Sequence, residues 1–114
     1  MVSGKDRKQV FEERAGIMRA LAHPSRLMMV DELSRGERCV CELTELVGAD
    51  ISTVSKHLSV LKEAGIVACR KEGVQVFYRL RVPCVLNVFS CVEAVRDEQV
   101  RRGTGESMAV AQSR

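Results

Sequence analysis

Aromatic residues and long apolar runs are scarce in this sequence of 114 residues. It contains no Trp, three Phe and one Tyr, so aliphatic side chains and Met must fill the core, which suits helices better than a β-sandwich. No apolar run approaches the roughly 18 residues of a membrane span. The N-terminus also lacks the apolar stretch of a signal peptide. We therefore expect a cytoplasmic protein that does not contact a membrane.

Histidine is scarce as well, with two residues, and cysteine is present in an odd number. The five cysteines are Cys39, Cys41, Cys69, Cys84 and Cys91. A reducing compartment and an odd count both argue against a static disulfide framework. Metal binding, redox chemistry and simple burial are the roles that remain for these thiols.

Positive charge is concentrated in one part of the chain, although the net charge is only +3. Residues 25–50 carry three basic and six acidic side chains, whereas residues 51–81 carry six basic and two acidic ones. Such a segment favours an acidic partner. We expect one domain over residues 1–100 and a polar, disordered tail over residues 101–114.

Helical periodicity accounts for the first part of the chain. Phe11, Ala15, Met18 and Ala22 share one face of a helix predicted over Gln9–Ala22. Pro24 can open a second helix, which carries Leu27, Val30 and Leu33 inward and ends before Gly36. A short third helix is predicted over Val40–Val47, with Gly48 ending it.

The clearest pattern follows Asp50, which we interpret as an N-cap. Ile51, Val54, Leu58 and Leu61 recur at steps of three and four, so they line one stripe of a helix whose other faces are polar. Two β-rich runs, Ile66–Arg70 and Val74–Arg81, then flank Gly73 as in a hairpin. A last helix with a broad apolar surface is predicted from about Pro83 to Gln99.

The predicted fold is mainly α with a β-hairpin wing, a winged helix-turn-helix in the order α-α-α-α-β-β-α. In such a fold the second helix of the motif, Ser52–Glu63, enters the DNA major groove. The tip of the basic hairpin, expected at Arg70 and Lys71, reaches the flanking backbone or the minor groove. An isolated helix with these residues would be read simply as a solvated face, but its neighbours favour DNA binding. The predicted DNA-binding residues are Ser52, Thr53, Ser55, Lys56, His57, Lys62, Arg70 and Lys71.

These segments resemble the ArsR family of metal- and metalloid-responsive repressors over roughly Met18–Leu80. The matching stretches are Ala20-Leu21-Ala22-His23-Pro24-Ser25-Arg26-Leu27, Gly36-Glu37-Arg38-Cys39-Val40-Cys41-Glu42-Leu43, Ser52-Thr53-Val54-Ser55-Lys56-His57-Leu58 and Ala64-Gly65-Ile66-Val67, leading to Arg70-Lys71-Glu72-Gly73. The resemblance implies a homodimer built on the first and last helices. It also implies binding to an inverted-repeat operator in double-stranded DNA, with release when an inducer binds.

Cys39-Val40-Cys41 matches the motif that supplies inducer ligands in the arsenic- and cadmium-responsive members of that family. Thiolates prefer soft ions, and trivalent arsenic is likewise thiophilic. Side chains two residues apart on an ideal helix point about 200 degrees apart, so both sulfurs can reach one atom only if the helix start is unwound. Such a distortion would move the following helix and give the inducer a route to DNA release.

The match is incomplete, because arsenite sensors with this motif often carry a third Cys where this chain has Thr44. A third sulfur could come from Cys84, from Cys91 or from a small cellular thiol, and a methylated arsenical needs only two. Cys84 and Cys91 stand about 10 Å apart along a helix, so one ion cannot bridge them, and burial is an equal alternative for both. We expect Cys69 to be structural and His23 to cap or pack, whereas His57 faces DNA.

The sequence thus predicts a repressor, and not an enzyme, that releases its operator on binding trivalent arsenic or another soft metal or metalloid, without an organic cofactor. A repressor of the same fold that senses oxidants or reactive sulfur is the alternative, since thiols beside Arg38 or a helix start are activated. A thiol enzyme is a weaker alternative, because neither His has a recognisable partner. A DNA-binding scaffold without an inducer also remains open.

Overall fold

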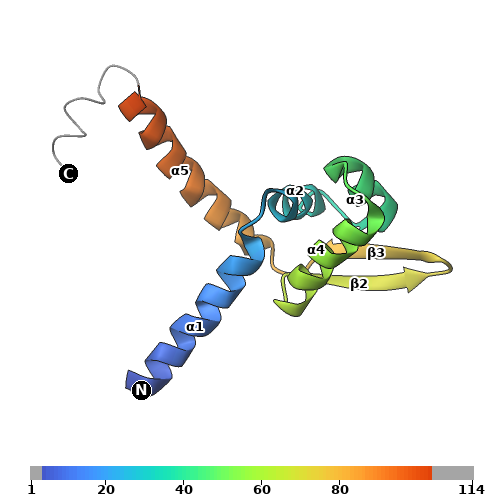
Figure 1. The fold of residues 1–114 in the computed structure, drawn as a ribbon, viewed down its shortest axis with the longest axis horizontal. Coiled ribbons are helices and arrows are strands. Elements are labelled where there is room, and N and C mark those ends of the chain that lie inside the picture. Colours follow the sequence, from blue (N-terminus) through green and yellow to red (C-terminus); the bar gives the residue numbers. More distant parts are fainter. Residues whose placement is uncertain (1–3, 104–114) are drawn as a thin grey trace. The chain divides into compact units, whose positions relative to one another are not determined.

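The computed structural model describes residues 4–103 and divides the chain into two units, one ending at Val82 and one beginning at Pro83. Each unit is described by itself below. The elements in chain order are α1 (Gly4–Leu21), α2 (Pro24–Leu33), β1 (Arg38–Cys39), α3 (Val40–Val47), α4 (Ile51–Glu63), β2 (Val67–Glu72) and β3 (Gln75–Leu80), followed in the second unit by a single 3-10 turn (Pro83–Val85) and α5 (Leu86–Gly103) (Figure 1).

The predicted order of helices and hairpin strands is confirmed, with one strand added. The bounds of α2 and α3 agree with the prediction, whereas α1 begins at Gly4 instead of Gln9. At the other end, α5 continues through residues 101–103, so the predicted tail begins too early. The rest of that tail, residues 104–114, lies outside the described residues.

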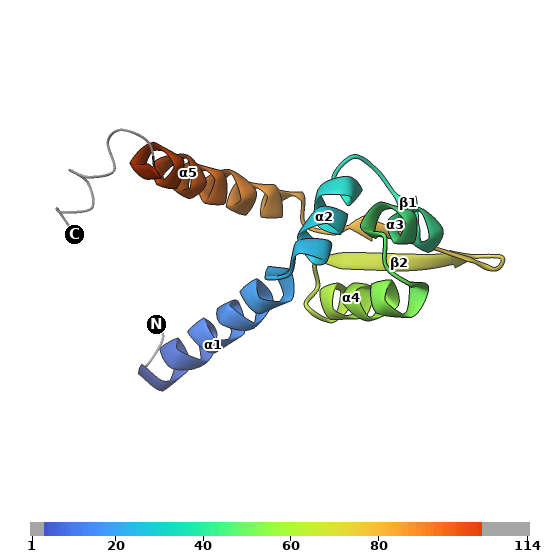
Figure 2. The same cartoon turned by 45° about the horizontal axis from the view of Figure 1, so that its top comes forward.

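The unpredicted strand is β1, which completes a three-stranded antiparallel sheet in the order β1-β3-β2 (Figure 2). Arg38 lies opposite Tyr78 and Cys39 lies opposite Phe77 on β3. A strand of two residues has no periodicity, and its partner lies almost 40 positions away, so the sequence holds no local signal for it. This pairing attaches the segment before α3 to the wing.

The wing is the hairpin of β2 and β3, joined by a turn at Gly73 and Val74. Gly73 has a φ of 64°, the left-handed conformation predicted for it. Val74 occupies the tip and is 96% exposed. Arg70 and Lys71, which were expected at the tip, lie on β2 before the turn.

Aliphatic side chains of α2, α3, α4 and the start of β2 form the core of the first unit. The largest fully buried residues are Met29, Val30, Leu43, Val54, Leu58, Leu61, Ile66 and Val67. The predicted stripe of α4 is therefore confirmed at its last three positions. Ile51 and Leu27 were also expected inside, but Ile51, in the first turn of α4, is 61% exposed and Leu27 is partly exposed.

The terminal helices expose many apolar side chains on the single chain, although Ala20 and Leu21 at the end of α1 are buried. Phe11 and Met18, which share the predicted apolar face of α1, are both exposed, and α5 has no buried residue. None of the helices within residues 4–103 is long and apolar enough to cross a membrane.

Candidate DNA interface and thiol pair

The start of α4 is fixed by Asp50, as its N-cap. The Oδ1 atom accepts hydrogen bonds from the Thr53 backbone N–H at 2.8 Å and from the Ser52 hydroxyl at 2.9 Å. These hydrogen bonds, above all the one from Thr53 N–H, lower the pKa of the Asp50 carboxyl. Gly48, with a φ of 75°, ends α3 just before, so the two helices are joined by a tight turn.

The outward faces of α4 are accessible and mostly polar, although Ile51 and Val60 are also exposed. Of the predicted DNA-binding residues, this surface carries Ser52, Thr53, Ser55, Lys56 and Lys62, and all five are exposed. Their short hydroxyl side chains allow a helix to approach base edges closely, and the lysines suit phosphates. The structure therefore brings these five residues together on one element.

His57 lies apart from that surface, on the flank of α4 that contacts α2. Its Nδ1 atom is 3.2 Å from Nη1 of Arg26, and its ring centroid is 4.3 Å from that of His23. Burial, reinforced by the charges of His23 and Arg26, lowers the pKa of His57. His23 itself caps α2, as expected, since its Nδ1 accepts the Ser25 N–H at 3.1 Å.

Arg70, on β2 of the wing, is held by two carboxylates, one from the loop before β1 and one from β2 itself. Its Nε and Nη2 atoms donate to the two carboxylate oxygens of Glu37 at 3.0 and 2.7 Å, and Nη1 donates to Glu72 at 2.9 Å. The guanidinium also lies over the Phe77 ring, 4.7 Å from its centroid. The bond to Arg70 lowers the pKa of Glu37. Two carboxylates thus offset the charge of Arg70, while Lys71 next to it is exposed.

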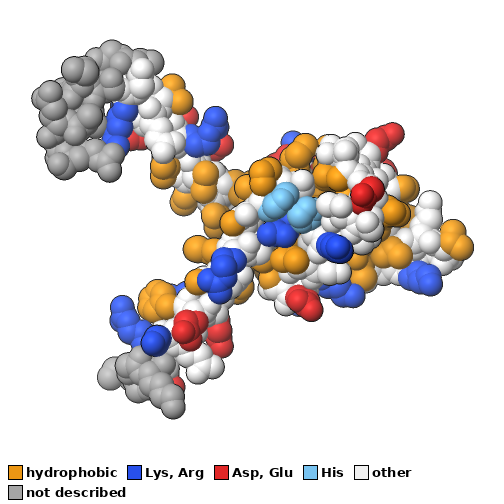
Figure 3. All heavy atoms as spheres, viewed as in Figure 1, with side chains coloured by type: hydrophobic (Ala, Val, Ile, Leu, Met, Phe, Trp, Pro, Cys, Tyr) orange, Lys and Arg blue, Asp and Glu red, His pale blue; other side chains and the backbone are white. Residues whose placement is uncertain are grey.

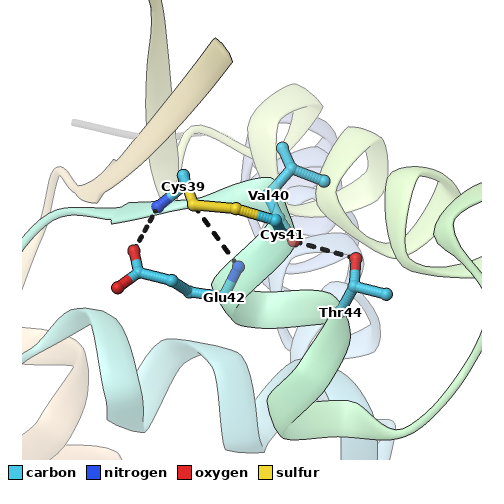
Figure 4. Close-up of a disulfide and its surroundings, with 5 residues drawn as sticks. All are labelled: Cys39, Val40, Cys41, Glu42 and Thr44. Carbon is cyan, nitrogen blue, oxygen red and sulfur yellow. Dashed lines mark hydrogen bonds between the residues drawn. A yellow bond between two sulfur atoms is a disulfide. The ribbon is translucent and has the colours of Figure 1, made fainter.

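Cys39 and Cys41 are joined by a disulfide (Figure 4). Cys39 lies on β1 with an extended backbone, φ −80° and ψ 161°, so it precedes the helix, and its Cα is 5.4 Å from that of Cys41. This meets the predicted condition that the helix start must depart from ideal geometry for the two sulfurs to meet. A static disulfide framework was not expected, and the single disulfide forms because strand pairing with β3 turns Cys39 out of the helical path.

The sulfur of Cys39 also caps α3. Its Sγ accepts the Glu42 N–H at 3.4 Å, while the Cys39 N–H donates to Glu42 Oε1 at 2.8 Å, which together form a capping box. Cys39 is only 6% exposed, whereas Cys41 is exposed. Thr44, where a third Cys was sought, donates its hydroxyl to the Val40 carbonyl at 2.8 Å (Figure 4).

The other three thiols are free and lie elsewhere. Cys69 is half-buried on β2 opposite Tyr78, in agreement with a structural role, and Cys84 and Cys91 are exposed in the second unit. Within residues 4–103 no group of three His, Cys, Asp or Glu side chains is placed to hold a metal ion. Arg38, expected beside the thiols, instead donates to Glu32 at 2.9 Å.

Three partners of the predicted site residues were missed from the sequence. Glu42 stands three residues after Cys39, the spacing of a capping box, and this signal was available once Cys is accepted as a cap. Glu37 binds Arg70 across 33 positions, and Arg26 meets His57 across 31. Neither long-range contact has a signature in a single sequence.

The chain matches known transcriptional regulators in sequence. Residues 23–68 match the model of the family described as "Bacterial regulatory protein, arsR family". The HTH-type transcriptional regulator Rv0324 of Mycobacterium tuberculosis is 35% identical over 101 residues, which cover 88% of this chain. The biofilm growth-associated repressor of Xylella fastidiosa is 42% identical over 76 residues, 67% of each chain. This chain spans 45% of the length of Rv0324.

A solved structure extends the likeness to the fold. The homodimeric winged helix-turn-helix DNA-binding domain of Mb0332 from Mycobacterium bovis, a fragment of residues 1–100 determined by NMR, is 35% identical and superimposes with a TM-score of 0.72. It covers 88% of this chain, and this chain covers 94% of it. These relatives are DNA-binding transcriptional regulators and not enzymes. The chain belongs to the ArsR family of winged helix-turn-helix transcriptional regulators.

Proposed function

We propose that this chain is a homodimeric repressor that releases an inverted-repeat operator when the thiols of Cys39 and Cys41 are oxidised to a disulfide. The observation that carries the proposal is the double role of Cys39, whose sulfur is both a partner in the disulfide and the N-cap of α3. A chemical change at that sulfur therefore acts on the first helix of the DNA-binding motif. The repressor name of the relative from Xylella supports the direction of control.

The proposed operator contacts come from α4 and the wing. The hydroxyls of Ser52 and Ser55 and the amine of Lys56 reach base edges and phosphates, while Lys71 and, after it leaves Glu37, Arg70 reach the flanking backbone. An inverted repeat follows from a two-fold symmetric dimer.

The terminal helices supply the proposed dimer contact. Exposed apolar side chains recur along both of them: Phe11, Ile17 and Met18 on α1, and Val88, Val92, Val95 and Val100 on α5. A second copy of the chain would remove this surface from water. The homodimer of the Mycobacterium bovis relative supports this occupant.

We infer the roles of the two cysteines in the oxidation from their different exposure. The accessible Cys41 thiolate attacks one oxygen of a hydroperoxide and keeps it, so that Cys41 becomes a sulfenic acid; the O–O bond breaks, and the other oxygen takes up a proton and leaves as water or an alcohol. The Cys39 thiol then attacks the Cys41 sulfur, forming the disulfide and releasing water. Two thiols are oxidised and one peroxide is reduced, so the electrons balance.

The disulfide has two structural routes to the DNA-binding surface. Cys39 ends β1, which pairs with β3 of the wing, and it caps α3, which packs on α4. In the reduced protein the Cys39 sulfur is released from Cys41, so the first turn of α3 and its connection to the wing relax together. We propose that operator affinity differs between the two states for this reason.

A trivalent arsenical is the second candidate inducer. The observation that favours it is the convergence of two sulfurs beside an exposed helix start, where reduced thiols can both bind one thiophilic atom. A methylated arsenical needs no more than these two ligands. Arsenite would take its third sulfur from Cys84, Cys91 or a small thiol.

A measurement of operator release that starts from the reduced protein distinguishes oxidation from binding of a trivalent arsenical. The operator is selected from random duplexes, and release is titrated with hydrogen peroxide, arsenite and methylarsenite for wild type, Cys39→Ser and Cys41→Ser. The matched control is Cys91→Ser, which removes an exposed thiol from α5. The oxidation proposal requires that peroxide releases DNA from wild type and the control only. If methylarsenite releases DNA and peroxide does not, the oxidation proposal is wrong and the arsenical is the inducer.

A further inference from the structure

Next to the predicted groove-reading surface, His57 of α4 joins two residues from the start of α2. Arg26 Nη1 is 3.2 Å from His57 Nδ1, and the rings of His23 and His57 lie with their centroids 4.3 Å apart. Both imidazoles are partly exposed, and Figure 3 shows them together on the surface beside a basic side chain. Three nitrogen-rich side chains from two elements thus gather at one point.

The contacts of the two rings fix which nitrogen carries the proton. Nδ1 of His57 accepts from the guanidinium, and Nδ1 of His23 accepts from the Ser25 N–H. In a neutral imidazole the other nitrogen, Nε2, is then the donor. Burial, reinforced by the charge of Arg26, lowers the pKa of His57 and so favours its neutral form. The pair therefore offers hydrogen-bond donors, and not the free Nε2 lone pairs that a metal needs.

Among the described residues Arg26 has no acidic partner, and its Nε is buried. Arg35, Arg38 and Arg70 all pair with carboxylates, whereas no ion pair involves Arg26 among the described residues. Its Nε is buried and has no hydrogen-bond partner within residues 4–103. The first turn of α2 contains no acidic residue either. A guanidinium in these surroundings favours an external anion.

We infer that Arg26, together with His23 and His57, binds a phosphate of the DNA backbone. This inference rests on the DNA-binding function, in which the outer face of α4 lies in the major groove. A helix in that groove has a phosphate strand on each side. The wing, with Lys71, lies on one flank of α4, and the cluster of Arg26, His23 and His57 lies on the flank that faces α2. A phosphate presents only acceptors, which matches the donors of this cluster.

Salt dependence of binding to a duplex of arbitrary sequence tests the inference, because a phosphate contact is independent of sequence. The variant is Arg26→Gln. The matched control is Arg35→Gln, which removes the same charge from a residue that follows the end of α2 and pairs with Asp31. We expect Arg26→Gln to weaken binding severalfold and to reduce the slope of log K against log salt by about 0.9. Arg26→Lys keeps the charge and restores the slope, which a purely structural role of the guanidinium would not allow.

Each outcome has one meaning. If wild type binds DNA and Arg26→Gln keeps the wild-type salt slope, the inference is wrong and the proposed function stands. If wild type binds no DNA, the proposed function is wrong, and the inference that rests on it fails as well. If Arg26→Gln does not fold, nitrogen NMR of the wild-type imidazoles decides. The Nε2 signals of both rings are expected to shift on addition of the duplex, and unchanged signals would overturn the inference.

Discussion

The two helices of the DNA-binding motif begin with the same geometry but with different atoms. In α4 the cap is a carboxylate oxygen of Asp50, 2.8 Å from the Thr53 nitrogen. In α3 the cap is the sulfur of Cys39, 3.4 Å from the Glu42 nitrogen. Both N-cap residues are extended, and both accept from the backbone three positions on.

The difference lies in what each cap can undergo. A carboxylate oxygen keeps its covalent structure under cellular conditions, whereas a sulfur can be oxidised or can bind a soft ion. Since α3 packs on α4, the variable cap sits one helix away from the DNA-reading surface, whose own start stays fixed. In the proposed function, this arrangement separates the sensing chemistry from DNA contact.

Cys39→Ser gives both helices an oxygen cap and so removes the difference between them. We expect it to have the largest effect on operator binding. Serine caps a helix well but cannot form a disulfide, so the response to peroxide should disappear. We expect the ratio of operator Kd after and before peroxide to fall from about tenfold or more, as is usual for an allosteric coupling, to one. Fluorescence anisotropy measures both values. If the variant still responds to peroxide, Cys39 is not part of the sensor.

Asp50→Ala removes the fixed cap and should act in every redox state. Without the hydrogen bond to Thr53 the first turn of α4 frays, and it carries Ser52 and Thr53. We expect Tm to fall by several degrees and operator binding to weaken equally in reduced and oxidised protein. Thermal unfolding and anisotropy test this, with Cys39→Ser as the control that keeps its Tm. Unequal weakening between the two states would contradict the separation of roles.

Glu37→Gln should have a smaller effect, in the opposite direction. The Glu37 carboxylate binds Arg70 at two points, so its neutral isostere frees the guanidinium for a phosphate. We expect operator binding to tighten by about threefold at low salt and by less above roughly 0.2 M, as screening increases. Asp31→Asn, which disrupts another exposed ion pair, is the control. Equal effects of the two substitutions would show a general charge effect instead.

The smallest expected effect is the pH dependence of stability near His57. Its pKa is lowered in the folded chain, so the unfolded chain binds a proton more readily. The free energy of unfolding is therefore unaffected above about pH 7 and declines as pH falls through the unfolded and then the folded pKa of this group. Denaturant unfolding between pH 8 and pH 5 should show a shallower decline in His57→Gln than in wild type. Parallel curves would rule out this contribution.

Regular patterns in the sequence predicted the elements of the DNA-binding unit. The apolar stripe of Val54, Leu58 and Leu61 specifies the buried face of α4, and Asp50 and Gly48 mark the turn before it. These features are local, so periodicity and capping rules suffice to find them. The position of the recognition helix follows directly.

Contacts between distant residues could not be predicted in the same way. Strand β1 exists because Cys39 pairs with Phe77, and Arg70 is held by Glu37 from the loop before that strand. His57 has the right spacing for a flank of α4, but only packing shows that it turns toward Arg26. Periodicity grouped Phe11 and Met18 on one face of α1, but it could not show that this face is exposed in the single chain.

The central claim is that the bond between Cys39 and Cys41 controls operator affinity, and one protein preparation can test it. Operator Kd is measured for the fully reduced protein, for the same sample after oxidation to the disulfide, and again after reduction with dithiothreitol. The account predicts that Kd rises by about tenfold or more on oxidation and returns to its first value on reduction. An equal Kd in all three states, with the disulfide verified by mass spectrometry, would contradict it.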